Sequence, residues 1–343
     1  MNELRKFLRD IYLGYLSKNY KSSSVSKVDM HVHYIPNAYR KALIKYYGDN
    51  NPDGFLTPEW TIETHLNFME KMNISTTMLS VTSPHINFGD DNAAKVLARE
   101  VNEDGAELVR KYPNQFGLLA SLPLPNIEGS IEEIHYALDV LQVDGFTLPT
   151  NTQGVYLGDH SLEPIFAELN RRKAIVVLHP NEPSAVPKHV LENFPTPFME
   201  FFFDTTRTVA NMIVKGTLRR FPDIRIVVPH AGACLPMLAD RWHVASKMMD
   251  IGEDGEGVDI YGELRKLYYD IAGVCLPLQL AALLKLVDDK HLFYGSDYPY
   301  TPKLGCVFLA NDLDKTDIIT KQQRRAIYSD NALSLFPRLN KDT

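Results

Sequence analysis

Cysteine is scarce in this sequence, and its scarcity limits how the chain can be held together. Only three cysteines occur among the 343 residues, Cys234, Cys275 and Cys306, and no two of them form a CxxC pair. An odd number of widely spaced cysteines favours neither a disulfide framework nor a zinc ribbon. A chain of this length can bury a large core without such crosslinks. Scattered cysteines are typical of a reducing compartment, so we expect a cytoplasmic protein.

Three further features are missing, and each excludes a class of protein. The formal net charge is −7 and no dense run of Lys and Arg occurs, which argues against a general affinity for nucleic acid. No segment approaches the roughly 20 apolar residues that a membrane-spanning helix needs. Neither GxGxxG nor GxxxxGK[S/T] occurs, so a nucleotide-binding fold is disfavoured. The sequence therefore predicts neither nucleic acid nor a membrane as a partner.

Residues 1–27 predict an amphipathic N-terminal helix followed by a linker rich in Lys and Ser. Apolar residues recur at helical spacing from Leu4 to Leu16, but Arg5 and Arg9 interrupt them. A secretory signal would need a continuous apolar stretch instead. We expect this helix to pack against the body of the protein or against a second subunit.

Residues 28–338 predict a single (β/α)₈ barrel, the α/β fold class also called the TIM barrel. Apolar runs typical of strands alternate with helical patterns, and several are apolar throughout, as expected for parallel strands covered on both faces. The expected strands cover residues 28–33, 74–82, 115–122, 144–149, 174–179, 224–230, 266–272 and 291–296. The same alternation fits a doubly wound open sheet, which the missing glycine-rich turn disfavours.

Helix starts and two long insertions complete the expected organisation. Thr57-Pro58-Glu59 predicts a helix running to about Met72, and Asp204-Thr205-Thr206 predicts a cap for a helix running to about Arg220. A last helix is expected around residues 319–336. The segments 34–56 and 181–203 are longer than ordinary barrel loops, and such long loops are usually functional. The second contains several phenylalanines that would either wall an apolar pocket or pack as core: Phe194, Phe198, Phe201, Phe202 and Phe203.

Four of the expected strands end in ionisable residues. The first ends with His31 and His33, the fifth with His179, the sixth with His230 and the eighth with Asp297. Residues two apart in a strand point to the same side, so both imidazoles of the first strand can face the barrel mouth. Active sites of such barrels are built at the C-terminal ends of the strands. We therefore expect these five side chains to converge.

Histidine nitrogens together with one carboxylate suit Zn²⁺, Mn²⁺ or Fe²⁺, and they leave a coordination position open for water or substrate. Each residue alone has a structural explanation, since buried histidines are often hydrogen-bonded core residues and an aspartate before Tyr-Pro is often a turn residue. Together they would be costly to bury without a compensating cation. The sequence therefore predicts one divalent ion per chain, with Zn²⁺ the first choice and Mn²⁺ the alternative.

The motifs around these residues resemble those of the amidohydrolase superfamily over almost the whole chain, from about Val28 to Leu335. They most resemble the branch of non-hydrolytic decarboxylases that act on aminocarboxymuconate semialdehyde, γ-resorcylate and 6-methylsalicylate. The matching segments are DMHVH at 29–33, HP at 179–180, PHAGA at 229–233 and GSDYP at 295–299. The resemblance implies His31, His33, His179 and Asp297 as ligands of one metal, and His230 as a catalytic histidine beside them.

The resemblance also bears on the substrate and the subunits. Arg241 matches an arginine that reaches into a neighbouring subunit's site in the semialdehyde decarboxylase, which implies a homodimer or homotetramer. The expected fourth strand carries no lysine to bridge two metals, so a mononuclear site is implied. No arginine lies between Arg40 and Arg99, where that decarboxylase has one for a substrate carboxylate. We expect His85, which follows the second strand, to contact substrate.

The expected function is a metal-dependent, non-oxidative decarboxylation of a small aromatic or unsaturated carboxylic acid. Asp297 and His230 would move a proton to the substrate carbon, which is general acid chemistry. The same five residues would also serve a metal-dependent hydrolase or hydratase, because a bound ion lowers the pKa of water. A barrel without catalytic activity, acting as a binding or scaffold protein, is a third alternative. It would be expected to have lost one of the five residues, and all are present.

Overall fold

The computed structural model describes residues 20–48, 52–192, 194–252 and 257–340, and within them the chain forms a barrel of eight parallel strands. In barrel order these are β1 (Lys27–His33), β2 (Ile74–Ser80), β3 (Phe116–Ser121), β4 (Gly145–Pro149), β7 (Ile175–His179), β8 (Arg225–Val228), β9 (Tyr268–Asp270) and β10 (Leu292–Phe293). The barrel closes where the backbone N–H of Met30 donates to the carbonyl oxygen of Tyr294 over 2.9 Å. The predicted (β/α)₈ barrel is confirmed.

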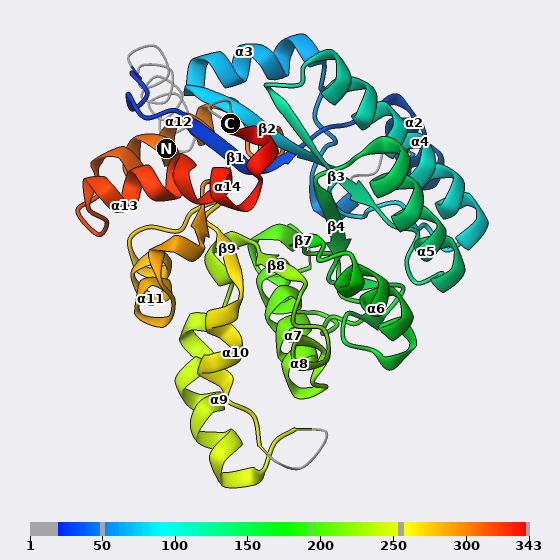
Figure 1. The fold of residues 1–343 in the computed structure, drawn as a ribbon, viewed down its shortest axis with the longest axis vertical. Coiled ribbons are helices and arrows are strands. Elements are labelled where there is room, and N and C mark those ends of the chain that lie inside the picture. The colour runs from blue at the N-terminus through cyan, green and yellow to red at the C-terminus, as the bar shows by residue number, and fades with distance from the viewer. Residues whose placement is uncertain (1–19, 49–51, 193, 253–256, 341–343) are drawn as a thin grey trace.

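Helices connect the strands and surround the barrel (Figure 1). They are α2 (Asn37–Tyr47), α3 (Ile62–Met72), α4 (Asp91–Lys111), α5 (Ile127–Tyr136), α6 (Glu163–Arg171), α7 (Glu200–Val214), α8 (Thr217–Arg220), α9 (Leu235–Met249), α10 (Ile260–Lys266), α11 (Leu278–Leu286), α12 (Lys303–Lys315), α13 (Lys321–Arg325) and α14 (Asn331–Leu335). A short hairpin follows β4, with strands β5 (Asn151–Thr152) and β6 (Val155–Tyr156). None of the helices in the described ranges is long and apolar enough to cross a membrane.

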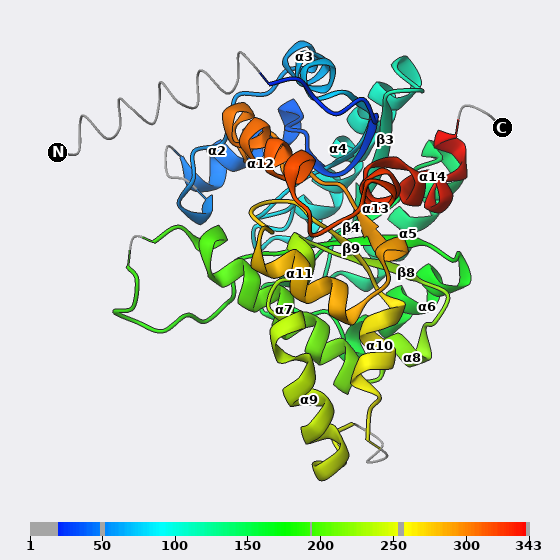
Figure 2. The ribbon, with the colours of Figure 1, turned by 90° about the vertical axis from the view of Figure 1, so that its left-hand side faces the viewer.

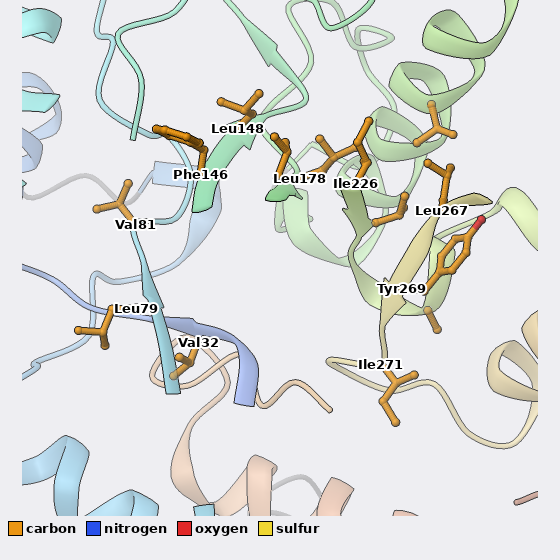
Figure 3. Close-up of a cluster of buried hydrophobic side chains, with 14 of the residues drawn as sticks. Val32, Leu79, Val81, Phe146, Leu148, Leu178, Ile226, Leu267, Tyr269 and Ile271 are labelled. Carbon is orange, nitrogen blue, oxygen red and sulfur yellow. The ribbon is translucent and has the colours of Figure 1, made fainter. Parts of the chain in front are cut away.

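The core consists of two layers of apolar side chains on opposite faces of the strands. The outer layer packs the barrel against its helices and includes Leu79, Phe146, Leu148, Leu178 and Ile226 (Figure 3). The inner layer fills the barrel and includes Val28, Met30, Met78, Leu119, Val177, Val227 and Phe293. Side chains of α14 join this inner layer. Because α14 closes the barrel where its strands begin, the opposite end is left for polar side chains.

The first strand changes face along its length. Val28 and Met30 belong to the inner layer, whereas Val32 belongs to the outer layer. The pairing of β1 with β2 is shifted between Asp29 and Val32, which explains the change. Because Val32 faces outward, its neighbours His31 and His33 face inward at the mouth of the barrel.

The predicted start of α3 is wrong by several residues. The helix begins at Ile62, and Thr61 rather than Thr57 is its N-cap. The Thr61 side chain accepts a hydrogen bond from the backbone N–H of Thr64, whose own side chain accepts one from the backbone N–H of Thr61. This reciprocal capping box satisfies two free amide groups, an advantage that Thr57-Pro58 does not offer.

The predicted cap at Asp204 is also wrong, because α7 begins at Glu200. The Asp204 side chain is buried and accepts hydrogen bonds from Thr150, Asn151 and Tyr156. Partners distant in sequence therefore use the carboxylate that a local pattern assigns to a cap. The single helix expected at 319–336 is divided into α13, a π-helical turn (Ala326–Asp330) and α14.

The two insertions are partly helical and meet each other. The segment 34–56 contains α2 and the 3₁₀ turn η1 (Pro52–Gly54), and the segment 181–203 contains the 3₁₀ turn η4 (Thr196–Phe198) and the start of α7. A Cβ on Gly54 would lie 3.2 Å from the Cα of Pro195, so the two segments are in close contact. Figure 2 shows the remainder of the second insertion standing away from the barrel beside α7.

The predicted N-terminal helix lies outside the described residues. The linker that follows it is described from residue 20 onward. That linker is held to the barrel, because Tyr20 Oη donates to Asp314 over 3.1 Å and Ser22 Oγ donates to the carbonyl oxygen of Met72 over 2.8 Å. At the other extreme of the molecule, α9 and α10 extend away from the barrel together (Figures 1 and 2).

Candidate metal centre and active site

The five ionisable residues expected at the strand ends lie together at the C-terminal mouth of the barrel. The imidazole centroids of His31 and His33 are 5.1 Å apart, and that of His179 is 5.4 Å from the first and 4.8 Å from the second. The His230 ring is 4.8 Å from that of His31. Ligand atoms of His31, His33 and His179 all lie within 4.8 Å of one another, and so do those of His31, His230 and Asp297.

The ring nitrogens at the centre of this group lack hydrogen bonds. Nε2 of His31 and Nε2 of His33 are buried without a hydrogen-bond partner among the described residues. The Asp297 Oδ1 atom lies 3.6 Å from the first and 3.2 Å from the second. Burying two ring nitrogens without partners next to a carboxylate oxygen costs free energy. A cation bound between these three atoms would offset that cost. The residues present therefore fit a divalent metal ion.

Hydrogen bonds at Nδ1 direct each Nε2 atom inward. Nδ1 of His31 lies 2.9 Å from Asp270 Oδ2, and Nδ1 of His33 lies 3.2 Å from Ser80 Oγ. Nδ1 of His179 lies 2.8 Å from the carbonyl oxygen of Pro180. Metal-binding histidines in proteins are generally oriented by such contacts at the second ring nitrogen. Only His179 has a further partner at Nε2, the Thr82 hydroxyl at 3.2 Å.

Asp270, which was not among the predicted site residues, also belongs to this group. It ends β9 and is fully buried. Besides contacting His31, it accepts hydrogen bonds at Oδ1 from the backbone amides of His230 and Ala272, at 3.1 and 3.0 Å. One carboxylate thus positions both a candidate ligand and the candidate catalytic histidine. A polar residue ending a buried strand was the available sign, as it was for His179.

The electrostatics of the group favour positive charge at its centre. Burial opposes protonation of His31, but the carboxylates of Asp270 and Asp297 outweigh it and raise the pKa of His31 to about 10. Burial by itself would raise the pKa of Asp297, but His31 and His33 hold that pKa well below its usual range. Burial and the neighbouring imidazoles lower the pKa of His179. A neutral His179 offers a lone pair to a cation.

The two residues expected to move protons, His230 and Asp297, have strained backbone conformations. Asp297 has a φ of 60°, and His230, Ala231 and Ala233 have φ values of 55°, 51° and 52°. Residues with side chains rarely occupy this left-handed region, and such strain is found preferentially at functional sites. At His230 it is held by the Asp270 contact and by Gln279, whose Nε2 donates to the His230 carbonyl oxygen over 2.5 Å.

A cavity of about 500 Å³ opens next to His179, His230 and Asp297. Its walls are mostly apolar and aromatic, and both insertions contribute to them. Among the phenylalanines in the sequence analysis, Phe198, Phe201 and Phe202 line the cavity, whereas Phe194 and Phe203 do not. The remaining aromatic walls are Phe55, Tyr300 and Phe308. The volume is in the range of sites for small organic ligands.

Neither of the two predicted substrate-binding residues lines this cavity. His85 is buried with its ring centroid 5.4 Å from that of His179, but it does not line the cavity. Arg241 is exposed on α9 and does not line the cavity of its own chain. The structure thus brings together the five strand-end residues, with His85 beside them, and leaves Arg241 on the surface.

Comparison with known proteins shows the family to which this chain belongs. The family model described as Amidohydrolase matches residues 28–338. The chain belongs to the amidohydrolase family. Its similarity to decarboxylase yanB of Aspergillus niger is 36% identity over 92% of this chain and 88% of the relative. It is also similar to the 6-methylsalicylic acid decarboxylase of Penicillium expansum. The two sequences are 33% identical over a match that covers 92% of this chain and 97% of that protein. The predicted membership of this decarboxylase branch is confirmed.

Solved structures give the same assignment of the fold. The crystal structure of an amidohydrolase II protein is 43% identical, with a TM-score of 0.86, and the match covers 91% of this chain and 100% of that one. The 5-carboxyvanillate decarboxylase LigW of Sphingomonas paucimobilis is 18% identical, with a TM-score of 0.79 and coverages of 92% and 99%. The enzyme class expected from the sequence, a decarboxylase, is confirmed by the curated relatives, which are named as decarboxylases.

Proposed function

We propose that this protein removes the carboxyl group of a small hydroxylated aromatic acid, using one divalent metal held by His31, His33, His179 and Asp297. The proposal rests on the convergence of these four side chains beside a mostly apolar cavity, which His179 and Asp297 line. Mixed imidazole and carboxylate donors suit Zn²⁺, and Mn²⁺ accepts them as well. Once bound, the ion would act as a Lewis acid on the substrate carboxylate or on a neighbouring hydroxyl.

His230 and Asp297 are the groups that would deliver the proton. Burial lowers the pKa of His230 to about 4, so its imidazole is neutral near pH 7 and has one donor and one acceptor nitrogen. Such a ring can pass a proton to Asp297 or to substrate. In the reaction a C–H bond forms at the ring carbon that carries the carboxylate. The C–C bond to that carboxylate then breaks, carbon dioxide leaves, and the electron pair restores the aromatic ring.

The cavity walls favour an aromatic substrate. The His230 ring is stacked with Phe202 at a centroid distance of 5.7 Å, and the rings of Tyr300 and His33 meet edge to face with centroids 5.8 Å apart. A flat ring placed between these aromatic walls would have its carboxylate next to the histidines. The name of the Penicillium expansum relative points to 6-methylsalicylate as the first acid to try.

We also propose that the working form is at least a homodimer. Large apolar side chains are exposed on α9, on the same helix as Arg241: Met237, Val244, Met248 and Met249. Exposed apolar patches of this kind mark subunit contacts in many proteins. Docking of a second copy at α9 would cover them and bring Arg241 toward the partner's cavity, where it would bind a substrate carboxylate.

An activity assay tests the proposal. Protein loaded with one equivalent of Zn²⁺ or Mn²⁺ and given 6-methylsalicylate or related hydroxybenzoates should release one carbon dioxide for each acid consumed. Chelator-treated protein should release none, and adding metal back should restore the activity. His230→Ala should lower kcat by about 10²- to 10⁴-fold with the metal still bound, whereas the exposed His135→Ala should have no effect. Failure of every aromatic acid to lose carbon dioxide would overturn the proposal.

A further inference from the structure

The two insertions together form one wall of the cavity, and their contact fixes its shape. Gly54 packs against Pro195, and the rings of Phe55 and Phe198 meet edge to face with centroids 5.5 Å apart. Residues 52–57 and 197–202 both contribute to the lining. This wall is therefore a packed structure made by two segments that the barrel itself does not require.

Asp53 is the charged side chain that this wall adds to the cavity. It sits at the centre of η1 with a φ of 57°, in the left-handed region that aspartate tolerates better than most residues. Its side chain is partly buried and lines the cavity together with Ser83. No lysine or arginine lines the cavity among the residues that the structure describes. Away from the metal centre, the charge of this cavity is therefore negative.

We propose that Asp53 selects substrates that carry a single carboxylate, and that it excludes acids with a second carboxylate elsewhere on the ring. This inference rests on the proposed function. The metal, the histidines and, in the proposed dimer, Arg241 of the second copy would accommodate the carboxylate that is lost. A second carboxylate would lie in the apolar part of the cavity, where this chain offers no lysine or arginine to pair with it, and would face Asp53. Repulsion between like charges in such a site discriminates strongly, because it penalises the wrong ligand without weakening the right one.

The surroundings of Asp53 make this selection depend on pH. Burial raises the pKa of Asp53 to about 7, the carboxylate of Glu182 adds to the increase, and a hydrogen bond with Ser83 opposes it. Among the residues that the structure describes, the tyrosines that interact with it, Tyr39, Tyr47 and Tyr300, have pKa values raised by burial and stay neutral across this range. Asp53 therefore gains charge between about pH 6 and pH 8, and discrimination against dicarboxylates should increase over that interval.

The test compares acids that differ by one carboxylate. The reference is salicylate, and the dicarboxylates are 2-hydroxyisophthalate and 4-hydroxyisophthalate, which are salicylates with a second carboxylate at different positions. Wild-type protein should prefer the reference in kcat/KM. Asp53→Asn, which keeps the shape of the side chain, should reduce that preference by roughly tenfold or more, as expected for removing one nearby like charge. The exposed Asp317→Asn should leave the preference unchanged.

A binding measurement keeps the inference separate from the proposed function. Calorimetry on the metal-loaded His230→Ala protein, with and without Asp53→Asn, gives the ratio of Kd values for the same acids without relying on turnover. If no acid is decarboxylated but the Kd ratio changes with Asp53→Asn, the proposed reaction is wrong and the selectivity stands. The inference is overturned if wild-type protein binds and converts mono- and dicarboxylates equally well. It is also overturned if Asp53→Asn changes their ratio no more than Asp317→Asn does.

Discussion

Asp270 and His31 are joined by a contact of 2.9 Å between Oδ2 and Nδ1, although 239 positions separate them in the sequence. The other oxygen of Asp270 accepts the backbone amide of His230. The carboxylate therefore holds one imidazole with its Nε2 toward the proposed metal position, and fixes the strained backbone of the other. This contact links metal binding to proton transfer through a residue that touches neither the proposed metal nor the substrate cavity.

Asp270→Asn should weaken metal binding. The amide side chain keeps the shape of the carboxylate but loses the charge that raises the basicity of His31. Substitutions of this kind typically lower metal affinity by about 10- to 100-fold. The Kd measured by competition with a chromophoric chelator should rise by that factor, while Asp223→Asn, at an exposed position, should leave it unchanged. An unaltered Kd in Asp270→Asn would show that the contact has no role in metal binding.

The proposed ligand set predicts a fixed metal stoichiometry. Purified, metal-supplemented protein should carry close to one transition-metal ion per chain, since β4 offers no lysine to bridge a second ion. His179→Ala or Asp297→Ala should lower the content sharply, because each removes one of about four donors. Elemental analysis by mass spectrometry measures the content, and His189→Ala on the exposed insertion is the matched control. Two metals per chain would contradict the assignment.

Mixed subunits test the role of Arg241. Arg241→Ala and Asp297→Ala should each be inactive, because one lacks the proposed carboxylate contact and the other a metal ligand. If Arg241 acts in the partner's cavity, a mixed dimer of the two variants contains one intact site. Unfolding and refolding the two together should then restore about a quarter of wild-type activity. Absence of any recovery, or a monomer by light scattering, would leave Arg241 as a surface residue.

The buried His65 predicts a loss of stability in acid. Burial lowers the pKa of His65 to about 3. In the folded protein the Nδ1 atom of His65 accepts a hydrogen bond from Trp60 Nε1. The unfolded chain therefore binds a proton near pH 6.5 that the folded protein excludes. The contribution of His65 to the free energy of unfolding therefore decreases as the pH falls from about 6.5 to 3, by up to about 1.4 kcal/mol per pH unit.

His65→Gln should remove this contribution. Urea unfolding of chelator-treated protein at several pH values between 4.5 and 6.5 gives the slope of the unfolding free energy against pH. The variant is less stable near neutrality because its packing is disturbed, but its slope should be shallower than that of wild type. His135→Gln, whose imidazole is half exposed on α5, should retain the wild-type slope. Equal slopes for wild type and His65→Gln would contradict the prediction.

The strand-end residues could be predicted from the sequence because their positions follow from the barrel. His31, His33, His179, His230 and Asp297 each end an apolar run, and parallel strands bring such ends to one mouth. The repeating pattern of strand and helix requires no knowledge of distant contacts. For this reason the eight strands could be located to within a few residues.

Asp270 and Asp53 could not be predicted in the same way. The role of Asp270 depends on a partner 239 positions away. A polar residue at the end of a short strand is common and does not by itself indicate such a partner. Asp53 lies in an insertion whose path is set by its contact with the second insertion, at Gly54 and Pro195. The misplaced cap at Asp204 has the same cause, since three distant hydrogen-bond donors determine what that carboxylate does. Local patterns do not contain such partners.

The central claim is that this site replaces a carboxyl group by a proton from solvent, and turnover in D₂O tests it most directly. The metal-loaded protein should convert a hydroxybenzoate into a product that is lighter by carbon dioxide and carries one deuterium, at the ring carbon that lost the carboxylate. Mass spectrometry gives the mass change and proton NMR gives the position. Conversion of a lactone or amide with uptake of water, and no carbon dioxide from any aromatic acid, would contradict the claim and identify a hydrolase.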